Sequence, residues 1–112
     1  MTAFERFEIV LSAGALNDLA DIRAYMTEVR GPDDATALIT ALLDRVEALT
    51  TFPHRGAMPK ETWDLEKVAL RQTIHAQYRI VYFVIGLTVR VVLIADGRRD
   101  MSALLRDRNL AP

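Results

Sequence analysis

Three strand-like runs follow one another in the second half of the chain with almost no sequence between them. The runs cover roughly residues 67–74, 78–85 and 88–95, and they are rich in β-branched and aromatic residues. Only residues 75–77 and 86–87 separate them. Parallel neighbours would need a crossover of about a dozen residues or more, so connections this short allow only antiparallel pairing. The sequence therefore predicts a three-stranded antiparallel meander.

The first half of the chain predicts one short strand followed by two helices. Residues 7–11 are apolar at every second position, which is typical of a strand with one buried face. Ser12 then stands at an N-cap position, and apolar residues recur at three- and four-residue spacing over residues 16–29. The Gly-Pro pair at 31–32 ends this helix and begins a second, which we expect to run to about Thr50. Such a short connection predicts an antiparallel helix hairpin.

The remaining segments complete a single domain. Residues 52–66 contain Pro and Gly without clear periodicity and are expected to form a loop. Residues 100–108 predict a short helix with Leu104 and Leu105 facing inward. We therefore expect one α+β domain over residues 1–112, in which the first strand and the meander share a sheet and the helix hairpin packs on one face.

Charge is unevenly distributed along the 112-residue chain. Residues 1–66 have six Lys or Arg against twelve Asp or Glu, whereas residues 67–112 have eight against three. A cationic half favours an anionic or dipolar partner. The absence of Cys excludes disulfides, thiolate metal sites and cysteine nucleophiles. With no signal-like N-terminus and no apolar run long enough to span a membrane, we expect a cytoplasmic protein without membrane association.

Basic side chains in the predicted meander are the first candidates for a binding site. Strand side chains alternate between faces, so Lys67 and Arg71 share one face, and Arg79 has apolar neighbours on its own face. Arg98 and Arg99 follow the last strand. If the helix hairpin covers one sheet face, the other carries a basic strip of Lys67, Arg71 and Arg79, with Arg98 or Arg99 beside it.

Each of these arginines also has a structural interpretation. Asp96 and Asp100 are nearby carboxylates that can pair with Arg79, Arg98 or Arg99. For Arg79 the structural and functional interpretations are equally open, whereas a functional role is favoured for Arg71. The other arginines of this half are expected to be solvated: Arg90, Arg106 and Arg108.

Motifs alone leave the function open. His54 and His75 lie in predicted turns without a partner histidine at ligand spacing, so we expect no metal site and no cofactor. Tyr78 and Tyr82 are expected in or near the core. The chain has no phosphate loop, dinucleotide fingerprint or Ser/His/Asp order.

The order of these elements resembles the RelE/ParE superfamily of toxins from bacterial type II toxin–antitoxin pairs. The resemblance rests on Leu70-Arg71, the run Tyr78-Arg-Ile-Val-Tyr82 and the segment Asp96-Gly-Arg-Arg-Asp100, together with segments 15–22 and 49–56. It covers essentially the entire chain. It implies a toxin that is neutralised by a cognate antitoxin, whose disordered C-terminal segment folds on binding.

The superfamily contains two activities. RelE-like members bind the ribosomal A site and cleave mRNA with basic side chains and a tyrosine, whereas ParE-like members poison DNA gyrase and need no nuclease centre. Ala69 stands where RelE-like enzymes carry a second strand lysine, and Leu105 falls near the place of their C-terminal tyrosine. Arginine is a poor proton shuttle because its pKa is above about 12. If the chain is a nuclease, the resemblance implies four basic residues as its candidates: Lys67, Arg71, Arg79 and Arg99.

We therefore expect a ParE-like toxin that inhibits DNA gyrase and is neutralised by a cognate antitoxin. A RelE-like ribosome-dependent mRNA endonuclease is the first alternative, and a non-toxic antitoxin-binding module is the second. The candidates for contact with the antitoxin or the target are the five basic residues of the predicted strip: Lys67, Arg71, Arg79, Arg98 and Arg99.

Overall fold

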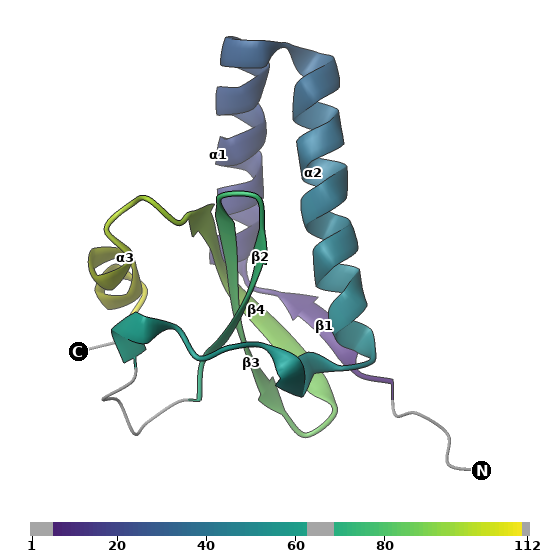
Figure 1. Cartoon of the computed structure of the whole chain (residues 1–112), viewed down its shortest axis with the longest axis vertical. Helices are drawn as coiled ribbons and strands as arrows, with labels where there is room; N and C mark the ends of the chain where they lie inside the picture. Colours follow the sequence, from purple (N-terminus) through teal and green to yellow (C-terminus); the bar gives the residue numbers. More distant parts are fainter. Residues whose placement is uncertain (1–5, 63–68, 111–112) are drawn as a thin grey trace.

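The computed structural model describes residues 6–62 and 69–110. Its elements follow the predicted order, with one strand and a helix hairpin before the meander (Figure 1). The elements are β1 (Glu8–Leu11), α1 (Ala13–Arg30), α2 (Pro32–Glu47), the 3₁₀ turns η1 (Ala48–Thr50), η2 (Pro53–Arg55) and η3 (Lys60–Thr62), β2 (Arg71–His75), β3 (Tyr78–Ile85), β4 (Thr88–Asp96) and α3 (Met101–Asp107). The predicted α+β fold is confirmed. In the described part of the chain, no helix is both long and apolar enough to cross a membrane.

The four strands form one open sheet in the order β1-β4-β3-β2. The last three strands are the antiparallel meander that their short connections predict. β1 pairs in parallel with β4, from Glu8 opposite Thr88 to Leu11 opposite Val91. This parallel pair is possible because the helix hairpin and the first two meander strands lie between the two segments in sequence.

Local signals set the helix boundaries. The Ser12 side chain accepts a hydrogen bond from the Ala15 N–H at 3.1 Å and caps α1. Gly31 has a φ of +96°, which disfavours any residue with a Cβ, and it separates the two helices. Pro32 then begins α2, at a position where a backbone N–H would have no acceptor within the helix, so its absence costs no hydrogen bond. The far end of the hairpin extends well beyond the sheet (Figure 1).

Each face of the sheet has its own apolar core. The helix hairpin covers one face, and Leu19, Leu42 and Val46 of the helices pack there against Ile80 and Tyr82 of β3. The second core lies beneath α3 and consists of these buried residues: Leu70, Val81, Val92, Leu93, Ala95, Met101 and Leu105. Leu105 is fully buried and Leu104 is partly buried, as the sequence predicts.

β4 contains a β-bulge, so its side chains do not alternate strictly between the two faces of the sheet as in a regular strand. Strict alternation would place Val91 and Leu93 on the same face. Instead, Val91 lies opposite Tyr82 and Leu93 lies opposite Val81, so Val92 is an extra residue in the ladder. Val91 therefore faces the helix hairpin and Leu93 faces α3, while Ile94 returns to the hairpin side.

Candidate functional site: the arginines of the sheet and its open edge

The predicted basic strip does not form across β2 and β3. Arg71 lies opposite Tyr82 and Ile74 lies opposite Arg79, so the Arg71 and Arg79 side chains project from opposite faces of the sheet. The cause is the length of the turn. A three-residue turn would have put both arginines on one face, whereas the observed turn has two residues and flips the relative facing of the strands. Lys67 lies outside the described residues.

Arg79 is buried, and each nitrogen of its guanidinium donates a hydrogen bond to a protein oxygen. Its Nη1 and Nη2 donate to the two carboxylate oxygens of Glu61 at 3.0 and 2.7 Å, and its Nε donates to Gln72 Oε1 at 2.7 Å. The hydrogen bond from Arg79 lowers the pKa of the Glu61 carboxyl below its usual range. Asp96 and Asp100 were candidate partners of Arg79 as well as of Arg98 and Arg99, but the carboxylate that pairs with Arg79 is Glu61. Glu61 takes this role because η3 brings the loop over the α3 side of β2 and β3.

Arg71 holds the segment after α2 against the sheet. Its Nη1 donates to the carbonyl oxygens of His54 at 2.7 Å and Gly56 at 3.0 Å. Beside it, the Tyr82 hydroxyl donates to the Pro53 carbonyl oxygen at 2.5 Å. Burial raises the pKa of the Tyr82 phenol, which keeps it protonated at neutral pH. Tyr82 is thus a core residue, as predicted.

Gly56 is required where this segment crosses Tyr82. A Cβ at position 56 would lie 2.0 Å from the Tyr82 hydroxyl oxygen and 3.0 Å from the Gln72 carbonyl oxygen. Only a residue without a side chain fits between the loop and the sheet at this point.

Arg98 and Arg99 lie together beside a shallow cavity between α1 and the end of β4. The predicted pairing of Arg98 with Asp96 is confirmed, with Nη2 and Oδ2 2.7 Å apart, and it lowers the pKa of the Asp96 carboxyl. The Arg99 side chain is exposed and forms no ion pair with any described residue. The cavity has a volume of about 350 Å³, and Tyr25 and Tyr78 also line it.

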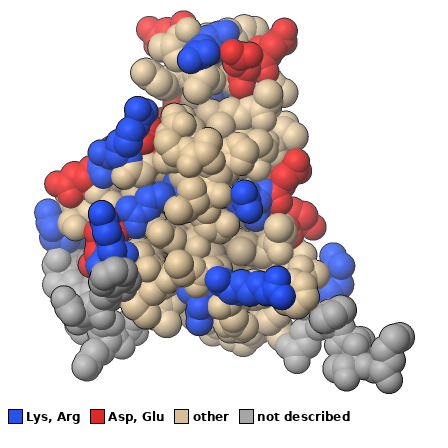
Figure 2. Space-filling model, viewed as in Figure 1, with Lys and Arg blue, Asp and Glu red and all other residues tan. Residues whose placement is uncertain are grey.

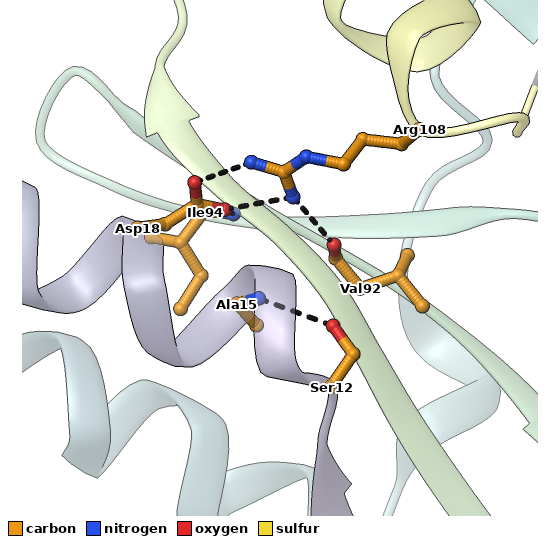
Figure 3. A network of polar contacts seen from close by, with 6 residues as sticks. All are labelled: Ser12, Ala15, Asp18, Val92, Ile94 and Arg108. Carbon is orange, nitrogen blue, oxygen red and sulfur yellow. Dashed lines mark hydrogen bonds and ion pairs between the residues drawn. The ribbon is translucent and has the colours of Figure 1, made fainter.

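Arg108 is not solvated as expected but ties α3 to the rest of the fold (Figure 3). Its Nη2 lies 2.5 Å from Asp18 Oδ1, and its Nη1 donates to Asp18 Oδ2 and to the Val92 carbonyl oxygen at 3.1 and 3.0 Å. Asp18 Oδ2 also accepts the Ile94 N–H at 2.9 Å. The Asp18 carboxylate of α1 therefore accepts hydrogen bonds both from the backbone next to the β4 bulge and from Arg108. Gly14 leaves room for this arginine, because a Cβ there would come within 2.9 Å of Arg108 Nη1.

A basic groove lies beside the end of α2 and shares no lining residue with this network. It has a volume of about 450 Å³ and runs between the end of α2, the segment after it and β2. Arg45 and Arg55 line it, and no Asp or Glu is among its described lining residues. The Arg55 guanidinium lies 4.4 Å from the centre of the Phe52 ring. We call this space the β2 groove.

The described residues offer little of the chemistry that RNA cleavage needs. Ala69 and Leu105 occupy the two positions discussed above, and Leu105 is fully buried beneath α3. Burial also raises the pKa of the Tyr78 phenol, and the Asp96 carboxylate adds to this effect. No three His, Asp or Glu side chains of residues 6–62 and 69–110 come together in a way that could hold a metal ion.

Comparison with known families decides the classification. Residues 9–101 match the family described as ParE toxin of type II toxin-antitoxin system, parDE. The chain belongs to the ParE toxin family. A solved chain of the chromosomal ParDE TA system from P. aeruginosa has the same fold as this ParE family member, with a TM-score of 0.67 and 16% sequence identity over 82% of this chain and 97% of that chain. No curated protein matches this ParE sequence.

Proposed function

We propose that this ParE family toxin inhibits DNA gyrase, cleaves no RNA, and is neutralised by a cognate antitoxin. The family assignment supports the toxin role, and the contacts of the sheet arginines support the choice of gyrase over the ribosome. The single observation that carries this choice is that each of the three guanidinium nitrogens of Arg79 donates a hydrogen bond to Glu61 or Gln72.

A guanidinium that stabilises the phosphorane of RNA cleavage must point its donors at the reacting phosphate. The three nitrogen atoms of Arg79 instead donate to protein oxygens, and the side chain is buried. Arg71 lies on the other sheet face and is bound to two backbone carbonyls. The two arginines therefore cannot act on one phosphate without rearrangement of the sheet.

Gyrase poisoning requires no such cluster, since the toxin needs only to bind and stabilise an enzyme–DNA intermediate. Among the members of the candidate set that the structure describes, Arg98 and Arg99 are exposed and accessible for such contact. They are the residues on which we base the proposed target contact. Arg71 is half-buried, and its contact with an antitoxin remains part of the proposal.

The proposal is tested by pulse labelling of a culture after induction of the toxin. Incorporation of labelled thymidine and labelled methionine is followed in parallel during the first minutes. An early fall in thymidine incorporation supports gyrase inhibition, and co-expression of the antitoxin should prevent it. An early fall in methionine incorporation would instead indicate mRNA cleavage, and no fall in either would indicate a non-toxic binding module.

A second assay with purified components separates direct from indirect effects on replication. Gyrase, supercoiled plasmid and ATP are incubated with the toxin, and linear DNA is measured after protein denaturation. The toxin should increase linear DNA over the level with gyrase alone. A variant with Leu42→Asp, which places a charge at a fully buried core position, provides an unfolded control at the same concentration.

A further inference from the structure

Two arginines of the β2 groove have charges that no described carboxylate neutralises. Arg45 lies in the last turn of α2 and Arg55 is the last residue of η2, and both are exposed. Among residues 6–62 and 69–110, neither arginine forms an ion pair or donates a side-chain hydrogen bond to a protein oxygen. The N–H donors of both guanidinium groups are therefore available to an anion in the groove.

An aromatic ring fixes one of these arginines at the groove. The Phe52 ring also lines the groove, and this residue is 42% exposed. The Arg55 guanidinium lies 4.4 Å from the ring centre, where the attraction between a cation and the face of a ring restricts its movement. An exposed ring beside a basic side chain is a surface on which unpaired nucleobases stack.

The wall formed by β2 adds a hydroxyl group and lies next to a further positive charge. Thr73 lines the groove and lies two positions after Arg71, so both side chains project from the sheet face that the helix hairpin covers. The Arg71 guanidinium is bound to the carbonyl oxygens of His54 and Gly56, in the segment that borders the groove. Its charge adds to the positive potential there.

The C-terminal end of α2 opposes anion binding at the groove only weakly. A helix C-terminus is equivalent to about half a negative elementary charge, whereas Arg45 and Arg55 each have a full positive charge. The described lining residues include no Asp or Glu to offset them. Figure 2 shows Lys and Arg side chains set in a largely uncharged surface over the lower part of the molecule. The groove is therefore electropositive.

The combination of charge and aromatic surface favours a nucleotide chain over other anions. The groove has a volume of about 450 Å³, which leaves room for more than a phosphate group. A phosphate can accept hydrogen bonds from Arg45 and Arg55, while the adjoining base contacts the Phe52 ring. In a duplex the bases are stacked and paired with one another. Only a single strand can therefore present both its backbone and a free base to this groove.

We propose that the β2 groove binds single-stranded DNA, with the phosphodiester backbone against Arg45 and Arg55 and a base against Phe52. This inference rests on the proposed function, in which the toxin stabilises an intermediate of gyrase and DNA. The toxin then holds a DNA strand of that intermediate as well as the enzyme. Strands that gyrase opens in the intermediate are the source of this ligand.

Charge reversal tests the phosphate contacts in the absence of gyrase. Fluorescence anisotropy measures binding of the full-length toxin to a labelled oligothymidylate of about twelve nucleotides. Arg45→Glu with Arg55→Glu should lower the affinity at least tenfold. The slope of log affinity against log salt concentration should fall by about 1.4, because each lost phosphate contact contributes about 0.7 for a single strand. An absence of binding by the wild-type protein would overturn the proposal.

A second pair of arginines provides the matched control. Arg90→Glu with Arg106→Glu makes the same charge change at exposed positions outside the groove, and should alter the affinity less than threefold. All four substitutions are at the surface, so both variants should keep the thermal transition of the wild type within a few degrees. Equal losses of affinity for the two pairs would overturn the proposal, because binding would then follow net charge alone.

Competition experiments identify the nucleic acid. Unlabelled oligothymidylate should displace the labelled strand at a concentration at least fivefold lower than a DNA duplex of the same length. Equal competition by the duplex would overturn the assignment of a single strand. An oligouridylate that competes more than tenfold better than oligothymidylate would overturn the assignment of DNA and indicate RNA as the ligand.

Nuclear magnetic resonance locates the bound strand without any substitution. Addition of oligothymidylate should shift the ring protons of Phe52 and the amide signals of Thr51 and Thr73, which line the β2 groove. The amide signals of Ala95 and Arg99, which line the cavity between α1 and β4, should stay in place. Shifts confined to that cavity would overturn the groove as the DNA site.

The linear-DNA assay with purified gyrase connects the groove to the proposed function. The variant with Arg45→Glu and Arg55→Glu should give at least fivefold less linear DNA than the wild-type toxin at equal concentration, whereas the control pair should match the wild type. Equal linear DNA from the groove variant would overturn the role of the groove in the intermediate. Gyrase inhibition by the wild-type toxin stands or falls separately, because pulse labelling measures it without reference to the groove.

Discussion

Asp18 of α1 and Arg108, which lies 90 positions later, form a bidentate ion pair that also fixes the bulge of β4. Because Asp18 Oδ2 accepts the Ile94 N–H as well, removal of the carboxylate leaves two partners unsatisfied. The Asp18 side chain is only 12% exposed, so solvent replaces these contacts poorly. The pair joins the first helix, the last strand and the last helix.

Asp18→Ala is therefore expected to destabilise the protein by about 2–3 kcal/mol. Arg108→Ala should cost less, because the Ile94 N–H keeps its acceptor. Urea unfolding of both variants and of the double variant measures the coupling between the two side chains. Asp21→Ala, an exposed carboxylate on the same helix, is the control and should change stability by less than about 0.5 kcal/mol.

The ion pair between Glu61 and Arg79 predicts a loss of stability in acid. The pKa of Glu61 is lowered in the folded protein, so its contribution is present above the pKa of the unfolded chain, which is about 4.3, and is lost as the pH falls through the folded pKa. Glu61→Gln should reduce the free energy of unfolding by roughly 1–3 kcal/mol at neutral pH. The difference should vanish near pH 2. A difference that is the same at both pH values would contradict this account.

Gly56→Ala should destabilise the protein through the contact with Tyr82. The added Cβ would meet the Tyr82 hydroxyl oxygen at 2.0 Å, and we expect a cost of about 1–3 kcal/mol from the forced shift. Tyr82→Phe removes that oxygen and the hydrogen bond to Pro53, and should cost about 1 kcal/mol alone. In thermal unfolding, the double variant should be more stable than the sum of the single effects predicts. Simple additivity would show that the hydroxyl is not the obstacle.

Deletion of residues 100–112 should remove the lid of the second core. Met101 is 2% exposed and Leu105 is fully buried, so their loss uncovers Leu70, Val81 and Leu93. We expect the truncated protein to unfold below the temperature of the full chain and to bind apolar dyes. Loss of toxicity in this variant would therefore reflect unfolding, whereas retention would exclude the segment from the target contact.

A surface substitution on α3 separates a loss of toxicity caused by unfolding from one caused by a lost target contact. Arg106 is exposed, and Arg106→Glu should leave the thermal transition within a few degrees of the wild type. A loss of toxicity in this folded variant would place α3 in the target contact. Leu105→Ala provides the opposite control and should cost about 2–5 kcal/mol of stability.

The fold was predictable because its strongest signals are local. Gly31 and Pro32 mark the break between the helices, and short connections leave the meander no other pairing. The bulge of β4 was not predictable, because residues 91–94 are all apolar and no polar side chain reveals which face each one takes. An extra residue in one strand of the ladder cannot be detected in the sequence when all of its neighbours are apolar.

Whether Arg71 and Arg79 share a face of the sheet depends on whether the β2–β3 turn has two residues or three. With His75 in β2 rather than in the turn, Arg71 and Arg79 exchange a shared face for opposite faces. The Arg98–Asp96 pair was accessible to sequence reasoning because its members are two positions apart. Glu61 was not, because it lies in a segment without periodicity and meets Arg79 only through the tertiary fold.

The parallel pairing of β1 with β4 has a consequence for synthesis of the chain. Glu8 emerges from the ribosome long before Thr88, its neighbour in the sheet, has been added to the chain. The first strand must wait without a partner until nearly the whole protein has been translated, because no earlier segment can replace β4. Translation products that end before β4 consequently lack the complete four-stranded sheet. A toxin built in this way acquires its folded form only at the end of its own production.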